Sequence, residues 1–205
     1  MKKKLRNWKK TWKMKRIMTK QYRITLTAGI FFLLSACSVS QFVPGEGIIR
    51  ENNYAVIRSD TLLIIVKPQS YPGSYQEINN RFFPVFASIK NNSTQKIKLQ
   101  ESSFSILCNE KQYDPVPVDY ILADLERKMM LKEFSDPFSP ATEFGITDRT
   151  KEQEMYYELV NNAFSRGELL PGAKKDGYLF YNKEIASASC FTINILGFAI
   201  PFIKQ

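Results

Sequence analysis

Phe83-Pro84-Val85-Phe86-Ala87-Ser88-Ile89-Lys90 is the stretch of this 205-residue chain that decides its fold. The odd-numbered residues are apolar, whereas Ser88 and Lys90 fall on the opposite side. Because side chains alternate between the two faces of a β-strand, this pattern predicts a strand with one face on a core and the other near solvent. Similar short runs of β-branched and aromatic residues predict further strands at 54–57, 62–66, 96–99, 104–108, 177–182 and 191–196.

Turn-forming residues separate these runs, among them Pro68, Pro72-Gly73 and Asn91-Asn92-Ser93. We interpret the last of these as a turn rather than as a glycosylation acceptor. Near the carboxyl end, Pro201 lacks the N–H group that a central strand needs. Residues 197–203 are therefore predicted to form an edge strand or a docking tail.

The spacing of apolar residues changes between Asp119 and Gly167. Two groups recur at helical intervals: Ile121, Leu122, Leu125 and Met129, and later Met155, Tyr156, Leu159, Val160, Ala163 and Phe164. We expect two helices, with the second starting at Thr150 and ending before Gly167, and a loop over 135–148. The helices are predicted to be an insertion between strands.

Several segments resemble the small immunoglobulin-like modules that are common in bacterial lipoproteins. The matching features are the Asn-rich turn between two strands within 87–99, a hairpin pattern over 104–113, and a Pro-Gly turn with an aromatic strand over 170–181. The resemblance covers roughly residues 81–115 and 168–196. It implies a mainly β domain over 53–205, an immunoglobulin-like antiparallel β-sandwich with a two-helix insertion at about 119–167.

The amino terminus has the three parts of an export signal. Between Lys2 and Arg23 there are eleven Lys or Arg residues and no acid, and residues 24–36 are uncharged. This apolar run of 13 residues is shorter than the about 20 that a membrane-spanning helix needs. It ends at Leu34-Ser35-Ala36-Cys37, which resembles the lipobox of bacterial lipoprotein signal peptides.

The lipobox resemblance implies where the protein is processed and anchored. Leu34, Ser35 and Ala36 would be recognised by the signal peptidase, and Cys37 would carry the lipid. Residues 1–36 are then the signal peptide, with Met18 as an alternative start, and residues 37–52 are the lipidated cysteine and a tether. Ser38 favours the periplasmic side of the outer membrane in a Gram-negative host; otherwise the location is the outer face of the cytoplasmic membrane.

Removal of the signal peptide changes the charge of the protein. The whole chain has a formal charge of +9, but residues 1–36 hold eleven basic residues and no acidic ones. The remaining 169 residues contain 18 basic and 20 acidic side chains, which is a net charge of −2. Binding to nucleic acid needs an excess of positive charge on the folded domain, so we do not expect a nucleic-acid partner.

Cys108 and Cys190 are the cysteines left after lipidation of Cys37. Both adjoin predicted strands, and an oxidising exported compartment would allow them to form a disulfide. The alternative is a pair of buried free thiols that pack as small apolar residues. The sequence leaves both alternatives open.

Residues for most enzymatic chemistry are missing. The chain contains no histidine, which excludes catalysis by Ser–His or Cys–His pairs and metal sites built on imidazole. We expect no metal and no cofactor, because two distant thiols do not make a zinc site. Carboxylate pairs for a hydrolase would be Glu152 with Glu154, or Asp114 with Asp119, but the first pair is two residues apart on a helix and points to different faces.

We therefore expect a membrane-anchored cell-envelope lipoprotein that acts as a binding or structural module through contacts with an envelope protein, and not as an enzyme. The alternatives are an exported ligand- or glycan-binding domain and a hydrolase that uses carboxylates alone. Aromatic residues could form an exposed binding surface, although we expect most of them to fill the core. They are Tyr71, Tyr75, Phe82, Phe83, Phe86, Tyr156, Tyr157, Phe198 and Phe202.

Overall fold

The structure is a computed structural model that describes residues 41–135 and 143–205, with side chains over 41–127 and 151–205. The predicted signal peptide, including Leu34, Ser35 and Ala36, and the lipidation site Cys37 lie outside these ranges. Among the described residues, no helix has both the length and the apolar character needed to cross a membrane.

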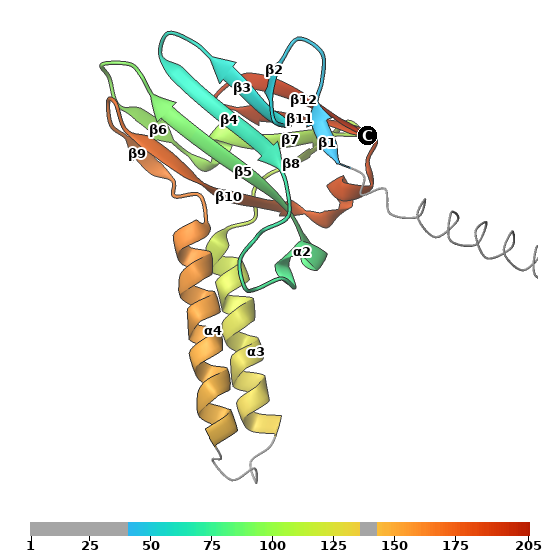
Figure 1. The fold of residues 1–205 in the computed structure, drawn as a ribbon, viewed down its shortest axis with the longest axis vertical. Helices are drawn as coiled ribbons and strands as arrows, with labels where there is room; N and C mark the ends of the chain where they lie inside the picture. Colours follow the sequence, from blue (N-terminus) through green and yellow to red (C-terminus); the bar gives the residue numbers. More distant parts are fainter. Residues whose placement is uncertain (1–40, 136–142) are drawn as a thin grey trace, which may run out of the picture. The chain divides into compact units, whose positions relative to one another are not determined.

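The fold is mainly β and has two larger sheets of five antiparallel strands each (Figure 1). The first, sheet A, has the order β1 (Phe42–Pro44), β12 (Phe198–Lys204), β11 (Cys190–Ile195), β7 (Phe104–Cys108) and β8 (Lys111–Tyr113). The second, sheet B, has the order β10 (Lys174–Asn182), β5 (Phe82–Asn91), β4 (Leu62–Pro68), β3 (Tyr54–Arg58) and β2 (Ile49–Glu51). A small third sheet pairs β6 (Ile97–Leu99) with β9 (Gly167–Leu169).

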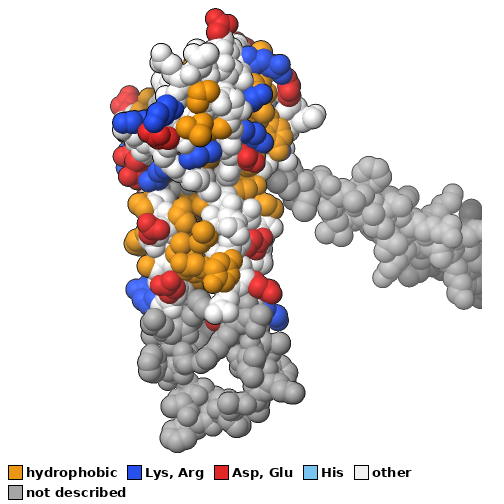
Figure 2. Space-filling model, turned by 90° about the vertical axis from the view of Figure 1, so that its left-hand side faces the viewer, with side chains coloured by type: hydrophobic (Ala, Val, Ile, Leu, Met, Phe, Trp, Pro, Cys, Tyr) orange, Lys and Arg blue, Asp and Glu red, His pale blue; other side chains and the backbone are white. Residues whose placement is uncertain are grey.

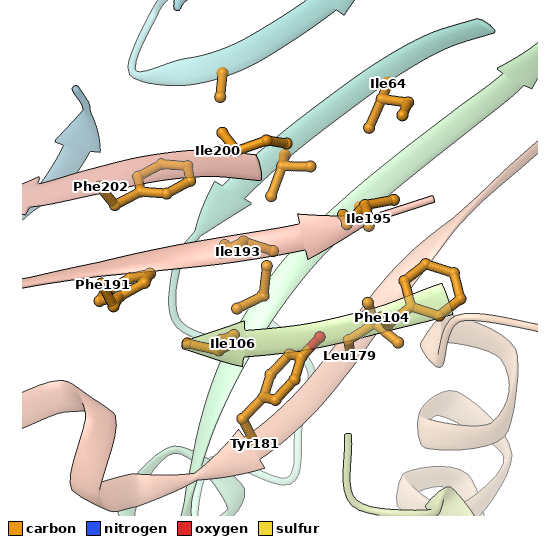
Figure 3. Packing of buried hydrophobic residues seen from close by; sticks show 14 of the residues in the cluster. Ile64, Phe104, Ile106, Leu179, Tyr181, Phe191, Ile193, Ile195, Ile200 and Phe202 are labelled. Carbon is orange, nitrogen blue, oxygen red and sulfur yellow. The ribbon is translucent and has the colours of Figure 1, made fainter. Parts of the chain in front are cut away.

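Sheets A and B share one hydrophobic core, so they pack face to face as in a sandwich (Figure 3). The predicted apolar side of β5 is confirmed, since Val85, Ala87 and Ile89 are fully buried. The other side is not near solvent as predicted, because Ser88 is 5% exposed and Lys90 is the residue of this strand that is exposed. Tyr181 of β10 also lies in this core, and its hydroxyl group has no hydrogen-bond partner among the described residues. Burial raises the pKa of Tyr181 well above its ordinary value.

Two long helices, α3 (Val118–Ser135) and α4 (Glu143–Asn162), lie side by side between β8 and β9 in the chain (Figure 1). The short helix α2 (Ile78–Arg81) precedes β5, and two 3₁₀ turns, η1 (Glu101–Ser103) and η2 (Lys183–Ser187), complete the structure. A second hydrophobic core joins the helices to the outer side of β10. It contains Tyr71, Tyr75, Ile78, Phe82, Ile121, Leu122, Leu125, Leu159, Ala163, Tyr178 and Phe180.

Both ends of the helical pair are held by β10, the outermost strand of sheet B. The N–H group of Val116 donates to the carbonyl of Phe180 (2.7 Å), and the N–H group of Phe164 donates to the carbonyl of Tyr178 (2.9 Å). At Gly177 the two segments approach so closely that a Cβ atom would lie 2.7 Å from the backbone of Phe164. A glycine at this position permits the contact.

The second helix differs from its predicted bounds at both ends. It begins at Glu143 rather than Thr150, because Pro140 is the last proline before it and nothing after that residue prevents helix formation. It ends at Asn162, before the expected terminator Gly167, because Ala163 pairs with Tyr178 and the next residue continues along β10. Gly167 instead begins β9, with a φ of 109°.

Part of the predicted tether over 37–52 belongs to the domain, since residues 42–44 and 49–51 are strands. The sequence pattern missed β1 because Pro44, Gly45 and Gly47 in and beside it indicate a loop. Phe42 is buried, and its ring centroid lies 5.7 Å from that of Phe83 and 4.7 Å from that of Phe191. The tether is therefore shorter than expected at its carboxyl end.

The prediction of an edge strand or docking tail at 197–203 is wrong, because β12 lies between β1 and β11 in sheet A. Pro201 is tolerated there for a local reason. Its carbonyl accepts a hydrogen bond from the N–H group of Gly45 (2.9 Å), just where β1 ends at Pro44. Pro201 has no N–H group to donate toward β1, but β1 has already ended at Pro44, so the missing donor interrupts no further pairing between the two strands.

Candidate interaction surface

Large apolar side chains are exposed on both helices. Among the described residues, Tyr120 of α3 is 62% exposed, and Tyr157 and Val160 of α4 are 63% and 43% exposed. Figure 2 shows hydrophobic side chains gathered over the helical part of one face of the molecule. Such gatherings on soluble domains commonly mark places where another molecule binds.

The residues of α4 form a continuous apolar surface. Tyr157 and Val160 are three residues apart, and Tyr156 and Val160 are four apart, so all three lie on neighbouring positions of the helix. Tyr156 is half-buried, and its ring meets that of Tyr157 edge to face with centroids 5.8 Å apart. We refer to Tyr156, Tyr157 and Val160 as the α4 tyrosine surface.

The other side of α4 packs on the second core and fixes this orientation. Leu159 of α4 is fully buried, and Ala163, directly after the helix, is 8% exposed. Glu158 accepts hydrogen bonds from the backbone N–H (2.8 Å) and the hydroxyl group of Ser74, in the segment that joins β4 to β5. These hydrogen bonds lower the pKa of Glu158 below its ordinary value. On α3, Asp124 accepts from both Arg81 and Arg127.

The described part of the helices is acidic. Residues 118–127 and 151–162 contain six carboxylates and two cations, which is a local charge of −4; the residues are Asp119, Asp124, Glu126, Glu152, Glu154 and Glu158, with Arg127 and Lys151. Glu154 is exposed and precedes Tyr157 by three residues, so it adjoins the α4 tyrosine surface. An exposed aromatic surface beside carboxylates favours a partner that presents cations with apolar side chains.

Most of the aromatic residues singled out in the sequence fill the two cores, as expected. Tyr71, Tyr75, Phe82, Phe83 and Phe202 are all less than 9% exposed. Tyr157 is the exception. The sequence pattern placed Val160 on the buried side of the helix, whereas it is exposed. The sequence contained a sign of this exposure. Apolar residues at 156, 157, 159 and 160 cover more of the helix circumference than one buried stripe does, so some of them must face outward.

Cys108 and Cys190 lie on neighbouring strands, but their environments differ. In the structure both thiols are free; Cys108 is buried in the sandwich core and Cys190 is exposed. The sulfur of Cys108 lies 3.9 Å from the carbonyl oxygen of Cys190. Burial, with the neighbouring thiol as a smaller contribution, raises the pKa of Cys108. A disulfide would require the buried and the exposed side chain to turn toward each other.

The carboxylates of the first pair proposed from the sequence, Glu152 and Glu154, do not lie on the same side of their helix. Glu152 is 8% exposed whereas Glu154 is exposed, as expected for residues two apart on a helix. Asp114 accepts a hydrogen bond from Gln112 (2.9 Å), and Asp119 lies exposed in the first turn of α3. Within the ranges that the structure describes, no group of three or more acids and cysteines is arranged to hold a metal ion.

A cavity of about 210 Å³ lies where the helices leave the sheets. Three segments line it. They contribute Val116, just before α3, and Asp119 of α3; Phe164 and Arg166, after α4; and Tyr178 of β10. Arg166 forms an ion pair with Glu101 (3.2 Å). The cavity is smaller than the about 300–1,000 Å³ that small-molecule sites usually occupy.

Comparison with known proteins identified no relative of this chain. No protein-family model, no curated protein and no solved structure matches this chain significantly. The function must therefore be inferred from the chain itself.

Proposed function

We propose that this protein is a cell-envelope lipoprotein whose domain binds an envelope protein through the α4 tyrosine surface. The observation that carries the proposal is the exposure of Tyr157 and Val160 on a helix whose opposite side is buried. Tyrosine is enriched at protein interfaces, where it adds a large contact area with few rotatable bonds. The domain then acts by binding and not by catalysis.

The anchor is proposed from the sequence pattern alone. Cleavage after Ala36 and lipidation of Cys37 would place the domain on the periplasmic side of the outer membrane in a Gram-negative host, or on the outer face of the cytoplasmic membrane otherwise. More than one acyl chain holds a protein stably on a bilayer. The substitution Cys37→Ser should abolish incorporation of labelled fatty acid and leave the precursor uncleaved. Normal labelling and maturation of this variant would contradict the lipobox interpretation.

The protein contact can be tested by photo-crosslinking in cells. A photoreactive amino acid at Tyr157 should give a discrete adduct with an envelope protein. The matched control is the same amino acid at Leu170, which is 57% exposed on another part of the domain. The adduct should be lost with Glu154→Lys, because the carboxylate favours a cationic partner. The proposal fails if Leu170 gives the same adduct or if Glu154→Lys leaves it unchanged.

A ligand- or glycan-binding role is the second candidate, and the cavity beside Arg166, although smaller than most small-molecule sites, is where a ligand would bind. A polar group in that cavity would meet the guanidinium group that now pairs with Glu101. Arg166→Ala should then weaken binding of an envelope glycan fragment, measured by calorimetry, without changing the adduct at Tyr157. Equal binding by the variant would argue against this role.

We also propose that the sandwich is immunoglobulin-like and that the helical pair is an insertion into it. The support is that both ends of the pair bond to β10 at carbonyls only two residues apart, Tyr178 and Phe180. A short Gly-Ser linker replacing residues 118–162 should therefore leave a folded sandwich, which circular dichroism would show as a retained cooperative β transition. Complete unfolding of this deletion variant would count against an insertion.

A further inference from the structure

Three cations lie in one row on the outer side of sheet B. Arg58 of β3 is directly opposite Leu63 of β4, Leu63 is opposite Lys90 of β5, and Lys90 is opposite Lys174 of β10. Directly opposite residues share one face of a sheet. The neighbours of this row along the strands, such as Ile64 and Ile89, belong to the core, so the row faces outward. We call Arg58, Lys90 and Lys174 the cationic row; all three are exposed.

The arrangement is electrostatically unfavourable by itself. Neighbouring strands are about 4.8 Å apart, so the row spans about 14 Å. At physiological salt the Debye length is about 8 Å, so Lys90 and Lys174 lie within it whereas Arg58, two strands away from Lys90, is largely screened from them. Like charges directly opposite each other, as in Lys90 and Lys174, destabilise a sheet. Two exposed ion pairs partly offset this repulsion, Arg58 with Glu51 (2.8 Å) and Lys174 with Asp176 (3.5 Å). Among the described residues, Lys90 forms no ion pair.

The row also stands out against the charge of the domain. Without residues 1–36 the chain has a net charge of −2, and the helical part is more acidic still. Apolar side chains adjoin the cations on the same face: Leu63 lies within the row, and Ile65 lies two residues further along β4. Both are half-buried. Cations mixed with aliphatic side chains on an exposed sheet face suit a broad anionic surface with an apolar interior.

We propose that the cationic row and its aliphatic neighbours bind the surface of an anionic phospholipid bilayer. The ammonium and guanidinium groups of the row would contact lipid phosphates, and this contact would relieve the repulsion between Lys90 and Lys174. Leu63 and Ile65 would contact the boundary between head groups and acyl chains. This contact is independent of the α4 tyrosine surface and does not require a lipid on Cys37.

The test uses the chain from Ser38 to Gln205, which lacks Cys37, because residues 41–205 form one compact unit with its own cores. The chain is sedimented with phosphatidylcholine vesicles that contain or lack phosphatidylglycerol. Each lysine near such a surface contributes about fivefold to binding, so Lys90→Gln with Lys174→Gln should lower the partition coefficient about 30-fold. The matched control, Lys98→Gln with Lys111→Gln, removes the same charge from exposed lysines elsewhere and should lower it by less than about threefold.

The outcomes separate this proposal from the proposed function. The membrane contact is supported if binding needs phosphatidylglycerol, falls with added salt, and is lost in the variant Lys90→Gln with Lys174→Gln but not in the control. The proposal is overturned if the unsubstituted chain does not bind these vesicles, if phosphatidylcholine alone suffices, or if the control variant loses as much. Tyr157→Ala should leave vesicle binding unchanged, so failure of the protein contact at α4 has no bearing on this result.

Discussion

Asn91, at the end of β5, should contribute more to stability than other polar residues of the sandwich. It is fully buried, and its side-chain amide makes four hydrogen bonds. Nδ2 donates to the carbonyls of Gln95 (2.7 Å) and Leu169 (3.1 Å), and Oδ1 accepts from the N–H group (2.9 Å) and the hydroxyl group (2.7 Å) of Ser93. The side chain thus joins the turn after β5 to β9.

The substitution Asn91→Ala removes all four bonds. Each contributes about 1 kcal/mol net, and water can replace some of them at Ser93 and Gln95. The carbonyl of Leu169 belongs to a buried residue and loses this donor. We expect the free energy of unfolding to fall by about 3 kcal/mol, which for a domain of this size lowers Tm by about 6–12 °C.

The assay is urea unfolding of the chain from Ser38 to Gln205, followed by circular dichroism. The control is Asn92→Ala, since Asn92 is exposed and should change the free energy of unfolding by less than about 0.5 kcal/mol. A loss below about 1 kcal/mol for Asn91→Ala, or a loss equal to that of the control, would refute the reasoning.

Four other outcomes are expected. Gly177→Ala should destabilise the fold by about 1–3 kcal/mol in urea unfolding, because its Cβ would press on the backbone beside β10; an unchanged midpoint would contradict the close approach. The native chain from Ser38 should react with a thiol reagent once, at Cys190, and at Cys108 only after unfolding; no reaction before reduction would instead show a disulfide. The lowered pKa of Glu158 means that its stabilising effect exists above the ordinary glutamate pKa of about 4.3 and is lost as pH falls through the lowered value. The difference in stability between the unsubstituted chain and Glu158→Gln should therefore disappear in acid, and a difference that persists there would exclude the ionic contribution. Tyr181→Phe should raise Tm or leave it unchanged in calorimetry, because it removes a buried hydroxyl group without a partner, and a clear fall would show that the hydroxyl is satisfied.

Elements with a repeated local pattern could be predicted from the sequence. The alternation over 83–90 identified β5 because ten residues in a row, Phe82–Asn91, form that strand. The three-residue strands β1 and β2 could not be identified, since pairing with β12 and β3 defines them and not their own pattern. For the same reason Pro201 misled the prediction: its tolerance depends on where the partner strand ends.

The candidate surfaces divide in the same way. Tyr157 was singled out as an aromatic residue, but its exposure depends on which side of α4 packs against β10 and the segment around Ser74. The cationic row could not be found from spacing, because Arg58, Lys90 and Lys174 are far apart in the chain and only strand register makes them neighbours. The periodicity of a segment predicts which of its residues lie on the same face of that helix or strand. Pairing between distant segments decides which residues of other strands lie beside them.

The attachment of both helix ends to β10 has a consequence for how the protein behaves before it is fully folded. An outer strand with free main-chain groups is a template on which another chain can pair. Here the N–H groups of Val116 and Phe164 donate hydrogen bonds to main-chain carbonyls of β10. A chain whose sheets have formed while its helices have not would present this strand to its neighbours. We therefore expect self-association to be greatest while the chain is being synthesised and folded, and to cease once the helices dock.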